Sequence, residues 1–234
     1  MDDTIAAATE LLAVLQLADS FFPSGRFTLS HGLESFGQAG LLPSAATLEP
    51  LVVDYLTEAV APSEGVAIAE ANRAAARGDI ERLVDIDQLL FALKLPAEAS
   101  TSSTRTGRQL VVTAGRLGVH PVLSAYDMAV KEGLAPGCHA VVFGVVTAAW
   151  GLSPLQAVVV ELYTYAANLL GAALRTVRLD HVQAQEIIMR IRPTIAEAAA
   201  IAARTDFKDM SAFAPTIESM QMLHQHAHVR LFAS

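Results

Sequence analysis

The stretch CHAVVFGVVTAAWGLSPLQAVVVE, residues 138–161, decides the fold of this chain. No charged residue occurs from Cys138 to Val160, a length that could cross a bilayer. However, Gly151-Leu152-Ser153-Pro154 interrupts the run, with a serine suited to an N-cap and a proline suited to the first helical position. The stretch therefore predicts a helix, a tight turn and a second helix, both buried in a protein core rather than in a membrane.

Helical periodicity continues on both sides of this stretch. Apolar residues recur every three to four positions, and no hairpin signal or fixed-period repeat occurs. Short connections favour antiparallel neighbours, so we predict an all-α, single-domain antiparallel bundle of about ten helices over residues 1–234. The predicted helices are Ile5–Leu17, Thr47–Ala61 with Thr47 as its cap, one that starts at Pro62, Ile80–Leu95 capped by Asp79, Ala97–Leu117, Val122–Lys131, His139–Trp150, Pro154–Val177, and His181–Arg204 with a kink or break at Pro193.

Composition points towards partners of protein type. Hydrophobic residues form 53% of the chain and charged residues only 17%, against a usual charged share of about a quarter. Apolar surface left after core formation tends to be covered by partners. The alternative is an alanine-rich helical protein whose apolar count reflects small residues. A net charge of −8 with no basic stripe argues against nucleic-acid binding.

The N-terminus and the cysteine content predict a cytoplasmic protein. Met1-Asp2-Asp3 is acidic where a signal peptide needs a basic region. The single cysteine, Cys138, cannot form an internal disulfide and fits a reducing compartment. We therefore expect no export and no membrane association.

Motifs of catalysis are missing from the sequence. There is no P-loop, no HExxH and no GxSxG. Cys138 and His139 are adjacent, but neighbours on a helix point about 100° apart and do not face each other. The sequence thus predicts no enzyme, no catalytic residue and no cofactor. Two alternatives stay open: a helical enzyme or small-molecule-binding protein with a buried pocket of converging polar residues, and a membrane-embedded helical protein.

An ordered motif occupies the N-terminal region. Residues 15–34 read LQLADSFFPSGRFTLSHGLE. This segment resembles the N-terminal signature of the UreF family of urease accessory proteins, in which Leu-Gln-Leu-x-Asp/Ser precedes Pro-x-Gly-Gly-Phe/Tyr and Ser-x-Gly-Leu-Glu. We predict a helix, a turn and a second helix capped by Thr28 or Ser30, with Gly32 allowing a close backbone approach. Arg26 departs from the pattern, because it stands where the family has its second glycine; a positive φ there would strain it.

Four further elements follow in the family's order, so the resemblance covers nearly the whole chain. They are STRTGRQL at 103–110, HAVVFG at 139–144 with Gly151 after it, RTVRL at 175–179 with Gln185 after it, and an ending that runs from MQMLH at 220–224 to RLFAS at 230–234.

The resemblance implies a function as well as a fold. UreF proteins are all-α and dimerise, bind the accessory protein UreD (also called UreH), and with it recruit the nickel-carrying GTPase UreG. The assembly delivers nickel to apo-urease, and UreF is viewed as a GTPase regulator and as part of a conduit for the ion. Carried onto this sequence, the partner-binding residues are Pro23, Gly25, Phe27, Ser30, Gly32, Glu34, Arg108, His224, Arg230, Leu231 and Phe232.

Residues 220–234 are predicted to be a C-terminal docking tail. The segment follows Pro215 and is rich in hydrogen-bonding residues, so we expect it to stay out of the core and to order on a partner. Arg230 offers a planar fork of donors and Phe232 an apolar anchor; a frayed, solvated end is the alternative.

Histidines in the same segment raise the question of a metal site. On a helix, His224 and His228 are four residues apart and share a face. They are weak candidates for a nickel contact, because a stable site needs three or four supported ligands. We predict no metal site.

Overall fold

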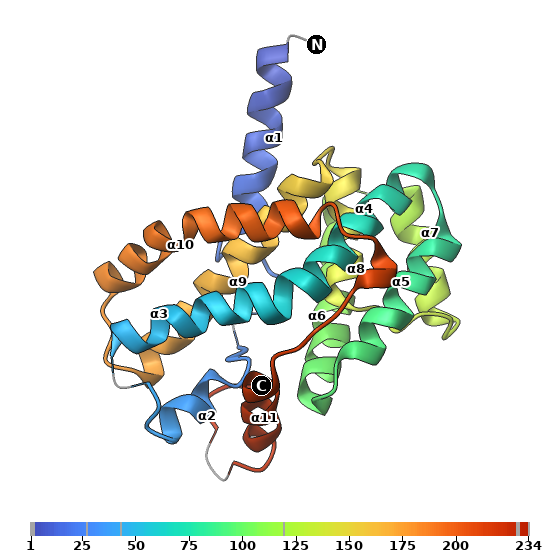
Figure 1. Cartoon of the computed structure of the whole chain (residues 1–234). Helices are drawn as coiled ribbons and strands as arrows, with labels where there is room; N and C mark the ends of the chain where they lie inside the picture. The colour runs from blue at the N-terminus through green and yellow to red at the C-terminus, as the bar shows by residue number, and fades with distance from the viewer. Residues whose placement is uncertain (1–2, 27, 43, 119, 228–229, 234) are drawn as a thin grey trace.

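The computed structural model describes residues 3–26, 28–42, 44–118, 120–227 and 230–233. These residues form helices and connecting loops, with no strand among them, so the all-α prediction is confirmed. Figure 1 shows the arrangement. The helices are α1 (Asp3–Ala18), α2 (Leu33–Gln38), α3 (Ala45–Asp54), η1 (Tyr55–Gly65), α4 (Val66–Arg77), α5 (Ile80–Leu93), α6 (Ala97–Leu117), α7 (Pro121–Lys131), α8 (His139–Ala149), α9 (Pro154–Thr176), α10 (His181–Ala202), η2 (Phe207–Asp209) and α11 (Pro215–His224).

Helix boundaries agree with the sequence wherever a capping side chain sets them. Asp79 accepts the backbone N–H of Arg82 at the start of α5. Ser153 accepts the N–H of Gln156 at 3.2 Å, and Gln156 accepts the N–H of Ser153 at 2.7 Å, which caps α9 reciprocally. These side chains satisfy N–H groups that have no partner within the first helical turn.

Three predicted helix boundaries are wrong. No helix starts at Pro62: it lies inside η1, whose wide π-helical turns join α3 to α4 and accommodate a residue that cannot donate a hydrogen bond. Ser44, not Thr47, is the N-cap of α3. Pro193 lies within α10, so the predicted break does not occur there, while a kink at this residue stays a prediction. Gly32, with φ of 85°, precedes α2, so neither Thr28 nor Ser30 caps that helix.

The core is built around the crossing of α4 and α8. A Cβ atom on Gly144 would lie 2.6 Å from the carbonyl oxygen of Ile68, so only glycine permits this approach. Helix α9 is long and apolar enough to span a membrane by length and composition, but 61% of its most apolar window is buried inside the fold. It is a core helix of this domain.

Helix α1 differs from the other helices because it projects from the body of the molecule (Figure 1). Leu17 is buried at its base. Four large apolar side chains of this helix face solvent, and they are Ile5, Leu11, Leu12 and Leu15.

Candidate functional site

The C-terminal segment folds back onto the N-terminal motif. Helix α11 starts with Pro215 at its first position and packs against α2 and α6. A Cβ atom on Gly32 would lie 3.0 Å from the backbone nitrogen of Gln221, so the predicted close approach at this glycine is real and its neighbour is α11. Gln221 donates to the carbonyl oxygen of His31, and further on Ala233 donates its N–H to the carbonyl of Thr28 at 2.8 Å.

Glu34 of α2 fixes the end of the chain. Its buried carboxylate accepts the backbone N–H of Leu231 at 2.9 Å and that of Phe232 at 3.2 Å. Gln38 donates to the same carboxylate from one turn further along α2. A carboxylate that accepts several N–H groups makes strong, charge-assisted hydrogen bonds. Glu34 therefore joins the N-terminal motif to the C-terminal segment, although the residues in contact lie almost two hundred positions apart in the sequence.

His224 lies between two carboxylates. Its Nε2 is 3.1 Å from Glu34 and its Nδ1 is 2.8 Å from Glu98 at the start of α6, and the ring is fully buried. An ionised carboxylate only accepts, so both contacts are hydrogen bonds when both ring nitrogens carry a proton. Arg230 donates to Glu98 at 2.8 Å and to the carbonyl of Gln225 at 3.1 Å. We call Glu34, Glu98, His224, Arg230 and the N–H groups of Leu231 and Phe232 the tail latch.

Gln225 adds a link between the tail and α6. With its amide oxygen turned towards α6, Gln225 accepts the N–H groups of Ala97 and Glu98, each at 3.1 Å. These are first-turn donors of α6 that lack an intrahelical partner. The tail thus acts as the cap of α6 and stabilises the start of that helix.

Most of the predicted partner-binding residues meet at the tail latch, and the others lie elsewhere. The residues brought together there are Gly32, Glu34, His224, Arg230, Leu231 and Phe232, and Ser30 is buried two residues before Gly32. Pro23 and Gly25 lie in the loop above α6, where Thr113 donates to the carbonyl of Pro23 at 3.4 Å. Arg108 is exposed on α6. Phe27 and His228 lie outside the described residues.

One expectation about the tail needs correction. The segment does not stay out of the core, because His224 and Phe232 are buried and the guanidinium of Arg175 lies 5.5 Å above the Phe232 ring. The described residues contain no group of three or more His, Cys, Asp or Glu side chains that could hold a metal, and both nitrogens of His224 face carboxylates.

A second polar cluster lies deeper in the fold, centred on Arg26. Its guanidinium is 2.6 Å from Glu161 of α9 and 3.4 Å from Nε2 of His139 of α8. Arg26 does not have a positive φ; among the described residues other than glycine, only His31 does, at 53°. The His31 ring packs on Tyr165 with ring centres 4.4 Å apart, and a partly buried ion pair joins Glu64 to Lys94 nearby. We call Arg26, His31, Glu64, Lys94, His139 and Glu161 the inner cluster.

Burial controls the charge of the inner cluster. Burial and the nearby Arg26 charge lower the pKa of His31 and of His139 to about 3, so both rings are neutral at pH 7. Burial also raises the pKa of Glu161, although Arg26 opposes the rise. For Glu64 the outcome is reversed: burial is again the largest single effect, but the nearby positive groups, chiefly Lys94, together outweigh it and lower the pKa to about 2.

Two hollows meet at Arg26 and His139. An inner cavity of about 100 Å³ is bordered by all six residues of the inner cluster and by Ser103. An outer cleft of about 370 Å³ lies under the loop of residues 19–26, and Arg26 and His139 line it as well. His31 Nε2, His139 Nδ1 and Ser103 Oγ are buried without a hydrogen-bond partner, so water molecules are expected to fill the inner cavity.

Sequence reasoning missed most of the inner cluster, and also Glu98. Helix α9 offered one signal: Glu161 is the first charged residue after a long uncharged run, and a lone carboxylate on such a helix is costly to bury without a partner. Cys138, set aside as a nucleophile, is fully buried, and burial raises the pKa of its thiol.

Comparison with known proteins adds to this geometry. A family model described as UreF matches residues 42–192. The chain is 32% identical over 227 residues to "Urease accessory protein UreF" of Yersinia pseudotuberculosis serotype IB (strain PB1/+), which covers 97% of this chain and 99% of the relative. Proteins of the same description from Yersinia pestis (strain Pestoides F) and Yersinia enterocolitica serotype O:8 / biotype 1B match with the same identity and coverage.

Proposed function

Because this chain belongs to the UreF family of urease accessory proteins, we propose that it is a non-enzymatic, cytoplasmic scaffold for urease maturation. In this role it binds a UreD-type (UreH) protein, recruits the GTPase UreG, and supports nickel insertion into apo-urease. Nickel is the cargo of the assembly rather than a resident cofactor of the chain.

The tail latch is the observation that carries this proposal. It joins the N-terminal motif, residues 15–34, to the C-terminal segment, residues 220–234, so that the two form one surface. Leu223 and Leu231 remain exposed beside it, next to the partly exposed guanidinium of Arg230. Large apolar side chains beside an arginine are typical of the energetic centre of protein interfaces.

The inner cavity argues against the alternative of an enzyme or a small-molecule-binding protein. It does bring together the converging polar residues that this alternative requires. However, about 100 Å³ is below the roughly 300–1,000 Å³ of ligand pockets, and the adjoining cleft of about 370 Å³ is lined by only two residues of the inner cluster, Arg26 and His139. Two histidines with pKa near 3 are also poorly matched to proton transfer near neutral pH.

Co-purification tests the proposed partners. The tagged full-length chain, co-expressed with a UreD-type and a UreG-type protein, is expected to retain both through size-exclusion chromatography. A chain that elutes alone, while the two partners are soluble and folded, would contradict the scaffold proposal.

Substituting Arg230 by alanine is expected to weaken assembly at least roughly thirty-fold, the effect of losing an interface anchor of about 2 kcal/mol. The variant loses the contacts to Glu98 and to the Gln225 carbonyl that hold the tail in place. Binding is measured by interferometry, with thermal unfolding as a stability check and Arg204→Ala as a matched exposed arginine.

A second variant separates positioning from direct contact. Glu34 is buried, so a partner cannot reach it, and Glu34→Gln should weaken binding only by loosening the tail. Normal binding by both variants, with unchanged unfolding, would show that the latch does not support docking.

A homodimer is part of the proposal, and α1 supports it. Beside its exposed leucines runs a groove of about 630 Å³, lined by Val14, Leu15, Val159, Tyr163 and Ile195 among others. A helix of this length is marginal in water without packing, so we expect a second copy to cover it.

The double variant Leu11→Glu, Leu12→Glu is expected to shift the sedimenting species at micromolar concentration from dimer to monomer. A wild-type chain that sediments only as a monomer would count against the dimer.

A further inference from the structure

Folding gathers three arginines on one face of α6. The stretch from Ala99 to Tyr126 contains no Asp or Glu, but it contains Arg105, Arg108 and Arg116. At 100° per residue these side chains fall within about 80° of one another, over about 16 Å of helix. All three are exposed. The expectation that the chain has no basic stripe is therefore wrong. The three arginines are not consecutive in the sequence, but the turn of the helix brings them onto one face.

These arginines, which we call the arginine face, lack acidic partners. No ion pair reaches any of them within the described part of the chain, and Arg108 donates only to the carbonyl of Thr104, at 3.3 Å. Five arginines elsewhere do pair with carboxylates of this same chain, namely Arg26, Arg73, Arg82, Arg190 and Arg230. Like charges on one face repel each other, so three unneutralised arginines in a chain of net charge −8 are available to bind an external group of negative charge.

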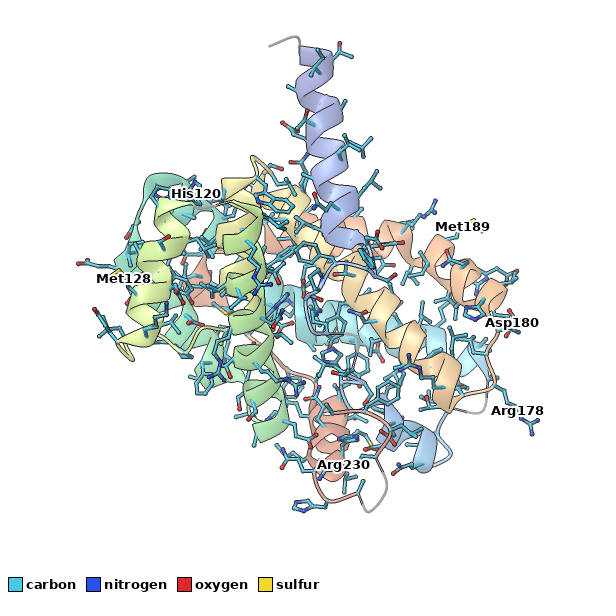
Figure 2. The ribbon with its side chains drawn as sticks, turned by 180° about the vertical axis from the view of Figure 1, so that it is seen from behind. His120, Met128, Arg178, Asp180, Met189 and Arg230 are labelled. Carbon is cyan, nitrogen blue, oxygen red and sulfur yellow. The ribbon has the colours of Figure 1, made fainter. Side chains whose placement is uncertain are left out.

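Helix α6 is a fixed platform for this face. Its opposite side is buried, and a Cβ atom on Gly107 would lie 2.1 Å from the carbonyl oxygen of Gly137, so helix and loop are in backbone contact. The start of α6 is held by Glu98 and the tail latch. A recess lined by Thr101, Arg105 and Ala233 joins the arginine face to the tail. Figure 2 labels Arg230 of the tail near the bottom of the molecule.

We propose that the arginine face binds an acidic segment of a protein partner, alongside the tail latch, as part of the scaffold function proposed above. Charge complementarity selects carboxylates, because guanidinium groups bind them in bidentate geometry. Exposed Val112 lies between the arginines and adds an apolar contact, which suits a protein surface. A polyanionic nucleic acid is disfavoured by the net charge of the whole chain.

Charge reversal tests this proposal. The variant Arg105→Glu, Arg108→Glu, Arg116→Glu is compared with Arg77→Glu, Arg204→Glu, Lys208→Glu, which changes net charge equally at exposed positions elsewhere. Association rates with a purified UreD-type protein, and separately with a UreG-type protein, are measured at about 50 and 300 mM salt. For one partner we expect association at least about ten-fold slower at low salt and loss of the salt dependence, with the control close to wild type.

Each other outcome overturns the inference. If the arginine-face variant binds both partners at the wild-type rate and salt dependence, the arginine face is not a docking surface, while the scaffold role stands. If the wild type binds neither partner, the scaffold role fails and the inference falls with it. If a 20-base-pair DNA duplex binds in an arginine-dependent way and the proteins do not, the acidic-protein assignment is wrong. Should the triple reversal not fold, the three Arg→Gln changes must slow association in the same direction.

Discussion

Replacing Arg26 by alanine is expected to lower the free energy of unfolding by about 3–5 kcal/mol. The guanidinium lies 2.6 Å from Glu161, and both side chains are buried. Removing the cation leaves a buried carboxylate without its partner, and burial already raises the pKa of Glu161. Urea denaturation followed by circular dichroism gives the change in stability.

The matched control removes both charges. The double variant Arg26→Met, Glu161→Leu fills the same space with apolar side chains and leaves no charge unpaired. Most of the stability lost in Arg26→Ala should therefore return. If the single Arg26 variant is as stable as the wild type, the ion pair does not hold the inner cluster together. If the double variant is as unstable as the single one, the loss comes from the packing of Arg26 rather than from the unpaired, buried charge of Glu161.

Acid is expected to destabilise the protein steeply, by up to about 4 kcal/mol between pH 6.5 and pH 5. His31 and His139 have folded-state pKa values of about 3, against 6.5 for a free histidine. A depressed pKa gives stability that is present above pH 6.5 and is lost as pH falls towards 3, because only the unfolded chain takes up the protons. Each histidine contributes about 1.4 kcal/mol per pH unit in that window.

Glu161 works in the opposite direction. Its raised pKa lets the folded state bind a proton first as pH falls, so it offsets part of the loss. The measurement is unfolding free energy against pH for the wild type and for His139→Gln, which should reduce the slope between pH 6.5 and 5 by about 1.4 kcal/mol per pH unit. Equal stability of the wild type at pH 6.5 and pH 5 would show that the two rings are not buried in neutral form.

The sequence predicts helix ends where the signal is local. Asp79, Ser153 and Gly118 act within one turn of their own helices, so α5, α6 and α9 begin or end close to where they were expected. Pro62 misled the prediction because its effect depends on whether a wide helical turn forms around it. No residue near Pro62 signals that turn.

The sequence predicted which residues belong to the candidate site, but it did not predict which of them contact each other. The family motif pointed to Glu34, His224 and Arg230. Their contacts join residues up to 198 positions apart, which no spacing rule can supply. The inner cluster is harder still, since Arg26, Lys94, His139 and Glu161 come from separate elements and only folding brings them to one cavity.

In vitro activation of apo-urease tests the central claim most directly. Apo-urease is incubated with nickel, GTP, a UreD-type and a UreG-type protein, with or without this chain, and urea hydrolysis is then measured. We predict nickel-dependent activation that requires this chain. Activation should be lower when the Arg230→Ala variant is used in place of the wild-type chain, and the chain itself should remain chemically unchanged. Equal activation without the chain, while the other components are active, would contradict the scaffold account.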